Sequence, residues 1–301
     1  MNAAFPFKNR ILQTLFFVFV VSVSLVSAQA KRIPLKKFQI TQLSDSLNEN
    51  SGLTFFQGHL LTINDSGNSS EIFQLNTQNG KIEKVYQTNL RNIDWEAISA
   101  DSTSIFIGDF GNNLGTRKDL KVFKIPFQNQ NLDINSVKEF PFQFQNQTDF
   151  TPKNLKTDFD VEAMVYHNNK IQIFNKEWAS KNISRYELDL NSIENQSLEK
   201  KESAPIQFSA TDAYFYENQL YVVGYTKTLK VYLAIFNVDE NGNWLPSKFR
   251  KIKLGNALKV GQVEGIAVNE NGIFISSERF IFPLKTVPSK LYFIPNHILK
   301  K

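Results

Sequence analysis

The tetrapeptide WEAI at residues 95–98 returns in altered form as VEAM at 161–164 and VEGI at 263–266. Two less similar copies, NSGL at 50–53 and TDAY at 211–214, complete a set of five. Each copy is followed after about six residues by turn-forming residues and then by a short apolar strand, so each copy predicts a β-hairpin. Because the copies recur about every 50 residues, the sequence indicates a repeat architecture.

Additional strands extend each hairpin. A third strand follows all five hairpins, and a fourth follows the first four. The last unit has no fourth strand of its own, but residues 35–43 form a spare strand ahead of the first repeat. If that strand completes the last sheet, the ring of sheets closes. This pattern predicts an all-β fold, a five-bladed β-propeller of four-stranded antiparallel blades, with residues 31–301 as one domain. The alternative is a β-sandwich with chance repeats, which five matching hairpins disfavour.

The composition excludes several classes of protein. Hydrophobic residues make up 42% and charged residues 21% of the 301 residues, which argues against a disordered chain or a multi-span membrane protein. The net charge of +5 is small and spread along the chain, so we expect no nucleic-acid partner. Without cysteine, the chain cannot form disulfides, thiolate metal sites or a cysteine nucleophile. We expect a monomer.

The N-terminus has the pattern of a secretory signal. Lys8 and Arg10 precede an apolar run at residues 15–26, and small residues follow it. The run is too short for a comfortable transmembrane helix. We therefore expect residues 1–30 to be a signal peptide cleaved after Ala28 or Ala30, and the mature protein to be periplasmic or secreted and free of the membrane. The alternative is an uncleaved anchor.

The repeated polar residue points to a metal site. The innermost strand of a propeller blade lines the central channel, so the same position in each blade meets at the axis. Four carboxylates there repel one another unless they are protonated or neutralised. Calcium, which takes 6–8 oxygen ligands, suits such a ring better than zinc. The predicted ligands are Ser51, Glu96, Glu162, Asp212 and Glu264. The alternative is that these acids cap backbone amides and never meet.

This repeat skeleton resembles that of the calcium-activated nucleotidase family, the soluble apyrases. The resemblance rests on Ser51, Glu96, Glu162 and Glu264, with Asp212 in the remaining position. It implies an exported five-bladed propeller that holds calcium in its channel through one Ser or acidic side chain from each blade, and it implies nucleotide hydrolysis. Six-bladed calcium propellers of the lactonase and esterase type are similar in a weaker sense.

A second set of polar residues is expected at the same mouth of the channel. Two antiparallel strands bring the chain back about 13 residues after each ring residue. Asp109 and Glu278 are the candidate general bases there. Lys176, Tyr225 and Arg279 are not turn formers, so they are candidates for binding a small anionic ligand beside the metal. Asp65, Asn68 and Asn113 join them as candidate substrate-binding residues, with Asx turns as the alternative for these three.

Two functions fit these expectations. The first is a calcium-dependent hydrolase of phosphoanhydride or ester substrates. The second is a non-catalytic propeller in which calcium is a structural plug and the rim binds a ligand or partner. The fold alone does not decide between them, because propellers of this type host both.

Overall fold

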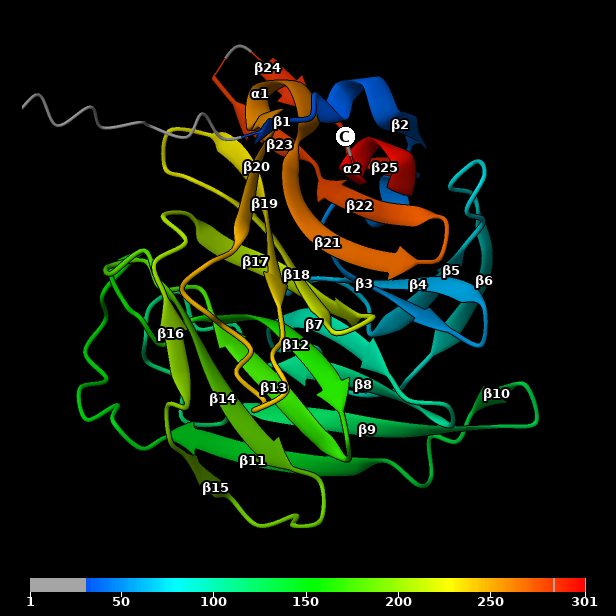
Figure 1. The fold of residues 1–301 in the computed structure, drawn as a ribbon. Coiled ribbons are helices and arrows are strands. Elements are labelled where there is room, and N and C mark those ends of the chain that lie inside the picture. Colours follow the sequence, from blue (N-terminus) through cyan, green and yellow to red (C-terminus); the bar gives the residue numbers. More distant parts are fainter. Residues whose placement is uncertain (1–30, 284, 301) are drawn as a thin grey trace, which may run out of the picture.

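The computed structural model describes residues 31–283 and 285–300, and the predicted signal peptide at residues 1–30 lies outside this range. Five small antiparallel sheets form a ring, so the protein is a five-bladed β-propeller (Figure 1). The inner strands touch in the order β3, β7, β12, β17 and β21, and β21 returns to β3. The predicted fold class is confirmed.

Each blade begins with the hairpin that the sequence repeats. Blade 1 contains β3(Asn50–Phe56), β4(His59–Asn64), β5(Glu71–Leu75) and β6(Ile82–Gln87); blade 2 contains β7(Trp95–Ala100), β8(Ser104–Asp109), β9(Lys121–Gln128) and β11(Lys138–Phe144). Blade 3 contains β12(Val161–His167), β13(Lys170–Asn175), β14(Ile183–Asp189) and β16(Glu202–Ala204); blade 4 contains β17(Ser209–Tyr216), β18(Gln219–Tyr225), β19(Lys230–Asn237) and β20(Arg250–Asn256). Blade 5 contains β21(Gln262–Asn269), β22(Gly272–Glu278), β25(Lys290–Pro295) and β2(Gln39–Gln42).

Blade 5 is completed by a strand from the start of the domain. Strand β2 pairs antiparallel with β25, with Gln39 opposite Tyr292 and Gln42 opposite Lys290. The expected strand at 35–43 is shorter than predicted, because Leu35–Phe38 form a 3-10 helix, η1. The predicted closure of the ring is present.

Short elements decorate the ring. β1(Lys31–Arg32) adds to blade 4 in parallel with β20, while β10(Asn131–Leu132) and β15(Gln196–Leu198) extend blade 2. A separate hairpin, β23(Phe280–Phe282) and β24(Lys285–Val287), follows β22. The helices are η2(Asp45–Leu47), α1(Ala257–Val260) and α2(Asn296–Lys300). Within the described ranges, no helix is long and apolar enough to cross a membrane.

The hydrophobic core lies between the blades. Five clusters of buried side chains each join two neighbouring sheets; one packs Leu61 and Ile63 of blade 1 against Ile105 and Ile107 of blade 2. Apolar burial therefore holds the blades together on both sides of each sheet. The inner strands are left to carry polar side chains toward the axis.

Candidate functional site

Each inner strand has a β-bulge, and in three blades the bulge positions a ring residue. In blade 1 the extra residue is Gly52, so Ser51 lies one residue before the position of the glutamates. In blades 2, 3 and 5 the extra residue of the bulge is Glu96, Glu162 and Glu264, respectively. An extra residue bends the strand and redirects its side chain. In blade 4 the extra residue is Thr211, so Thr211 and not Asp212 occupies the position of the glutamates.

The assignment of Asp212 as a metal ligand is corrected by its contacts. One carboxylate oxygen accepts hydrogen bonds from the backbone amides of Leu53, at 3.2 Å, and Ile266, at 2.7 Å. The other accepts from the amide of Ala213 at 2.8 Å. Asp212 is completely buried and connects blade 4 to the inner strands of blades 1 and 5. For this residue the amide-capping alternative is correct.

A cavity of about 500 Å³ opens at the channel mouth where the ring residues lie. All five blades contribute to it. Nine predicted site residues line it: Ser51, Asp65, Glu96, Asn113, Glu162, Lys176, Tyr225, Glu264 and Glu278. The structure therefore brings most of the predicted metal and rim residues to one place.

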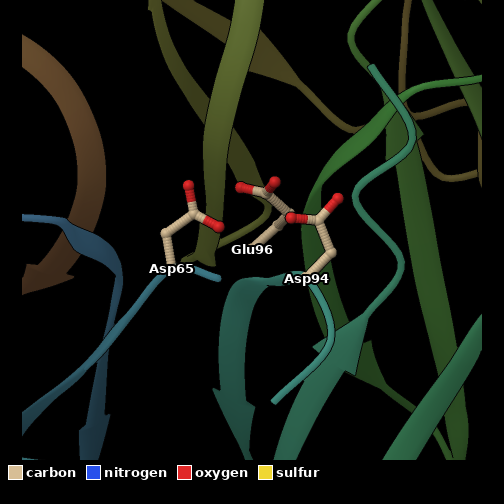
Figure 2. A group of neighbouring side chains, drawn as sticks. All are labelled: Asp65, Asp94 and Glu96. Atoms are coloured by element: carbon tan, nitrogen blue, oxygen red, sulfur yellow. The ribbon is translucent and has the colours of Figure 1, made fainter. Parts of the chain in front are cut away.

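Three carboxylates converge beside this cavity, and two of them, Asp65 and Glu96, line it. Asp65 follows β4, Asp94 precedes β7 and Glu96 lies on β7, and ligand oxygens of all three lie within 4.8 Å of one another (Figure 2). Gly111 permits this close approach, because a β-carbon there would lie 2.3 Å from Glu96 Oε1 and 2.5 Å from Asp94 Oδ2. We call Asp65, Asp94 and Glu96 the acid cluster.

Burial makes the acid cluster costly to ionise. Burial raises the pKa of Glu96 well above its usual range, and the negative charges of Glu162 and Asp65 raise it further. Burial raises the pKa of Asp65 to about 7; the amide of Ser66 opposes this rise and the Asp94 carboxylate adds to it. Within the described residues, no group donates a hydrogen bond to the 4% exposed Glu96 side chain. A proton or a cation would compensate this carboxylate.

Lys176 neutralises a different part of the ring. Its Nζ lies 2.9 Å from Glu162 Oε1, and both side chains are buried. The same ammonium lies 4.9 Å from the ring centre of Trp178 and 5.5 Å from that of Tyr225. Burial opposes the charged form of Lys176, but the carboxylate of Glu162 and other nearby anions raise its pKa well above the usual value. Lys176 is thus already paired with a protein carboxylate.

Glu264 and Glu278 form the remaining acidic wall. Gln262 donates a hydrogen bond to Glu278 and another, at 3.3 Å, to the hydroxyl of Tyr225. Burial raises the pKa of Glu278 well above its usual range, and the charge of Glu264 raises it further. A carboxyl group with a raised pKa at a cavity wall has the properties of a general acid or base.

Three other predicted site residues do not line the cavity. Asp109 is buried and forms an ion pair with Arg117 at 2.9 Å, and it also accepts a hydrogen bond from the amide of Asp94. It therefore positions the acid cluster and is not placed to act as the base. Asn68 donates to Glu49 at 2.6 Å, and Arg279 is exposed outside the cavity lining.

The sequence reasoning missed several residues of the site. Asp94 stands two residues before Glu96, and Asp160 and Gln262 stand two residues before Glu162 and Glu264. Asp94 precedes β7, and the bulge at Glu96 interrupts the alternation of side chains, so strand periodicity did not reveal Asp94. The residues of the cavity lining that the sequence reasoning did not place at this mouth are Leu155, Leu229 and Gln262.

The donor set suits a hard cation. The acid cluster offers carboxylate oxygens, and Ser51, whose hydroxyl donates to the Glu96 carbonyl at 2.6 Å, lines the same cavity. Oxygen ligands are those that calcium and magnesium prefer, whereas zinc favours nitrogen and sulfur. The residues present therefore fit a calcium ion at the acid cluster, which only partly coincides with the predicted five-residue ring.

Comparisons with known proteins give similarity of shape alone. No family model and no curated protein matches the chain. Among solved structures, the computationally designed Ika8 protein is 8% identical, with a TM-score of 0.36 over 85% of this chain and 100% of that one. The hydrazine synthase of Kuenenia stuttgartiensis is 10% identical, with a TM-score of 0.39 over 84% of this chain and 67% of that one.

Proposed function

We propose that the protein is an exported calcium-binding β-propeller whose cavity hydrolyses phosphoanhydride or ester substrates. The observation that carries the proposal is the acid cluster, three neighbouring carboxylates of which Glu96 is buried and Asp65 and Asp94 are partly buried. Asp65 and Glu96 line the cavity. Their mutual repulsion and the missing donor to Glu96 favour occupation by a divalent cation. The resemblance to the soluble apyrases is consistent with this function.

Each part of the cavity has a role in this proposal. Asp65, Asp94 and Glu96 hold the ion, and Asp109 with Arg117 orients the segment that carries Asp94. Bound calcium would polarise a substrate oxygen and lower the pKa of a coordinated water. Glu278 is the candidate base, because it lines the cavity and burial raises its pKa. Lys227, which is exposed at the rim, can contact an anionic group of the substrate.

A non-catalytic propeller with a structural calcium is the second candidate. It is favoured by the Lys176–Glu162 ion pair, since the buried cation expected to bind a substrate anion is already neutralised. In that case the rim would bind a ligand without converting it.

One experiment tests the metal and the activity separately. The full chain is unfolded thermally with calcium and with chelator, and is assayed against nucleotides, phosphate esters and lactones. Calcium at a hundred times its dissociation constant should stabilise the fold by about 2.7 kcal/mol. Glu278→Gln should abolish turnover and keep the calcium-dependent stabilisation, while His59→Ala, on the hairpin turn at the far end of β4, should change neither. Equal melting temperatures with calcium and chelator would contradict the metal site, and calcium binding without turnover would select the second candidate.

A further inference from the structure

The cavity has an apolar wall that the acid cluster does not explain. Leu155, Trp178 and Leu229 line it together with Lys227. They come from the connection between blades 2 and 3 and from loops of blades 3 and 4, whereas the acid cluster comes from blades 1 and 2. The cavity therefore has one side for a cation and another for an apolar group. We call Leu155, Trp178 and Leu229 the apolar wall.

The apolar wall is held in place by specific contacts. The indole Nε1 of Trp178 donates to Asp160 Oδ2 at 2.8 Å, and Lys227 Nζ donates to the Leu155 carbonyl at 3.3 Å. Leu155 and Leu229 both have positive φ values, 50° and 62°, which are uncommon for a bulky side chain. Such conformations persist where surrounding contacts enforce them, and they concentrate at ligand-binding sites. Leu155 nevertheless stays 38% exposed, so its side chain is available to a ligand.

The volume leaves room for more than a hydrated ion. Calcium with six waters, at about 30 Å³ each, takes up roughly 200 Å³. The cavity measures about 500 Å³, so more than half of it remains for the body of a ligand. A body that fills this space removes the two leucines from water, which favours binding in proportion to the apolar area covered.

The contacts of Trp178 favour an aliphatic body over a planar ring. Its ring already faces three ammonium groups, those of Lys176 at 4.9 Å, Lys181 at 5.7 Å and Lys227 at 5.8 Å. A planar ligand would have to displace a cation to stack on the face that the cation covers. An aliphatic chain between Leu155 and Leu229 needs no such displacement.

We propose that the cavity binds a small amphiphilic anion, with an oxyanion head group at the metal and an aliphatic body against Leu155 and Leu229. This inference rests on the proposed function, because the acidic cavity attracts an anion only when it holds the cation. Carboxylate and phosphate head groups both offer anionic oxygens to a bound cation.

Titration calorimetry of the calcium-loaded full chain tests the proposal. The probes are n-alkyl phosphates and n-alkyl carboxylates of two to eight carbons. Affinity should rise about threefold to fourfold for each added methylene. The head group that binds more tightly shows whether the natural ligand is a phosphate or a carboxylate. Leu155→Ala and Leu229→Ala should each lower the affinity for the longest ligand by about tenfold and leave the affinity for the two-carbon ligand unchanged. Leu114→Ala is the matched control, since Leu114 is 46% exposed but does not line the cavity.

The outcomes separate this inference from the proposed function. Two results would overturn the proposal of an aliphatic body and leave the metal site intact. One is a protein that binds calcium but whose affinity for the n-alkyl ligands does not depend on their chain length. The other is tighter binding of phenyl phosphate than of hexyl phosphate. If the chain binds no calcium, the same series is run with n-alkylammonium ions in chelator. A chain-length dependence that Leu155→Ala removes would then support the apolar wall and overturn both the metal and the anionic head group. No binding in either series would overturn both proposals.

Discussion

Thr211 and Asp212 show how one residue of register changes a chemical role. The bulge in β17 gives Thr211 the position that glutamate has in three other blades, and its hydroxyl donates to the Val263 carbonyl at 2.6 Å. Asp212, one residue later, reaches backbone amides of blades 1 and 5. At the bulge position a carboxylate could be a metal ligand, whereas one residue later the carboxylate of Asp212 joins three blades through hydrogen bonds.

Replacing Asp212 should therefore affect folding and not metal binding. Asp212→Ala leaves three amides without their acceptor, at about 1 kcal/mol or more each, so we expect a loss on the order of 3 kcal/mol in unfolding free energy. Urea unfolding measures this loss, and calorimetry should find calcium affinity unchanged. Glu240→Ala, an exposed acid, is the control. A large drop in calcium affinity at full stability would return Asp212 to the ligand set.

Glu96→Gln should have opposite effects on the two forms of the protein. Without calcium, folding requires Glu96 either to take up a proton or to bury a charge that is repelled by Glu162 and Asp65, because burial raises its pKa well above the usual range. Gln removes this cost, so the melting temperature should rise. With calcium, the loss of a charged ligand should reduce affinity about tenfold or more. Thermal scans with and without chelator measure both effects, with Glu240→Gln as the control. A destabilised chelated variant would show that Glu96 has a structural partner.

The acid cluster also predicts a pH dependence for the metal-free protein. Burial raises the pKa of folded Asp65 to about 7 from 3.8, with Asp94 and Glu264 adding to the rise. Between these values the folded state keeps a proton that the unfolded state has lost, so stability should decrease as pH rises through this window. Calcium binds the deprotonated form, so its stabilising effect should grow over the same range. Thermal scans of the unsubstituted protein from about pH 5 to about pH 8 should show both trends. Asp65→Asn is the control, and both trends should be weaker in it. A metal-free melting temperature that is flat or rises with pH would contradict the raised pKa of Asp65.

Among the strands, β2 is short but closes the ring. It covers the edge of β25, and Leu43, just after it, donates its amide to the Ser289 carbonyl at 3.0 Å. Leu43 is buried in the cluster between blades 5 and 1. The strand thus contributes both hydrogen bonds and apolar contacts to the closure.

Removing β2 should destabilise the ring. A chain starting at residue 44 leaves the β25 edge unpaired, so we expect a lower melting temperature and aggregation compared with a chain starting at residue 31. A chain starting at residue 33, which lacks only β1, is the control and should remain soluble. Equal stability of the two truncated chains would argue that β2 does not close the ring.

For the complete ring, the sequence was informative wherever the repeat was regular. The WEAI-type copies predicted five blades, their inner strands and three of the ring glutamates, because hairpins depend on local alternation and turns. The register of blade 4 could not be predicted, since Thr211 and Asp212 are both polar and a shift of one residue exchanges the faces. The partner of Lys176 and the apolar wall depend on loops that meet only after folding, and those loops carry no periodic pattern.

The pairing of Gln39 with Tyr292 also sets an order of events during synthesis. About 250 residues separate the two partners, so at about 5–20 residues per second the strand β2 waits roughly 12 to 50 seconds for its neighbour. Four blades can be assembled by then, but β2 has no edge to join. A chain that ends before residue 290 therefore carries an unclosed ring, because the edge that β2 joins is missing.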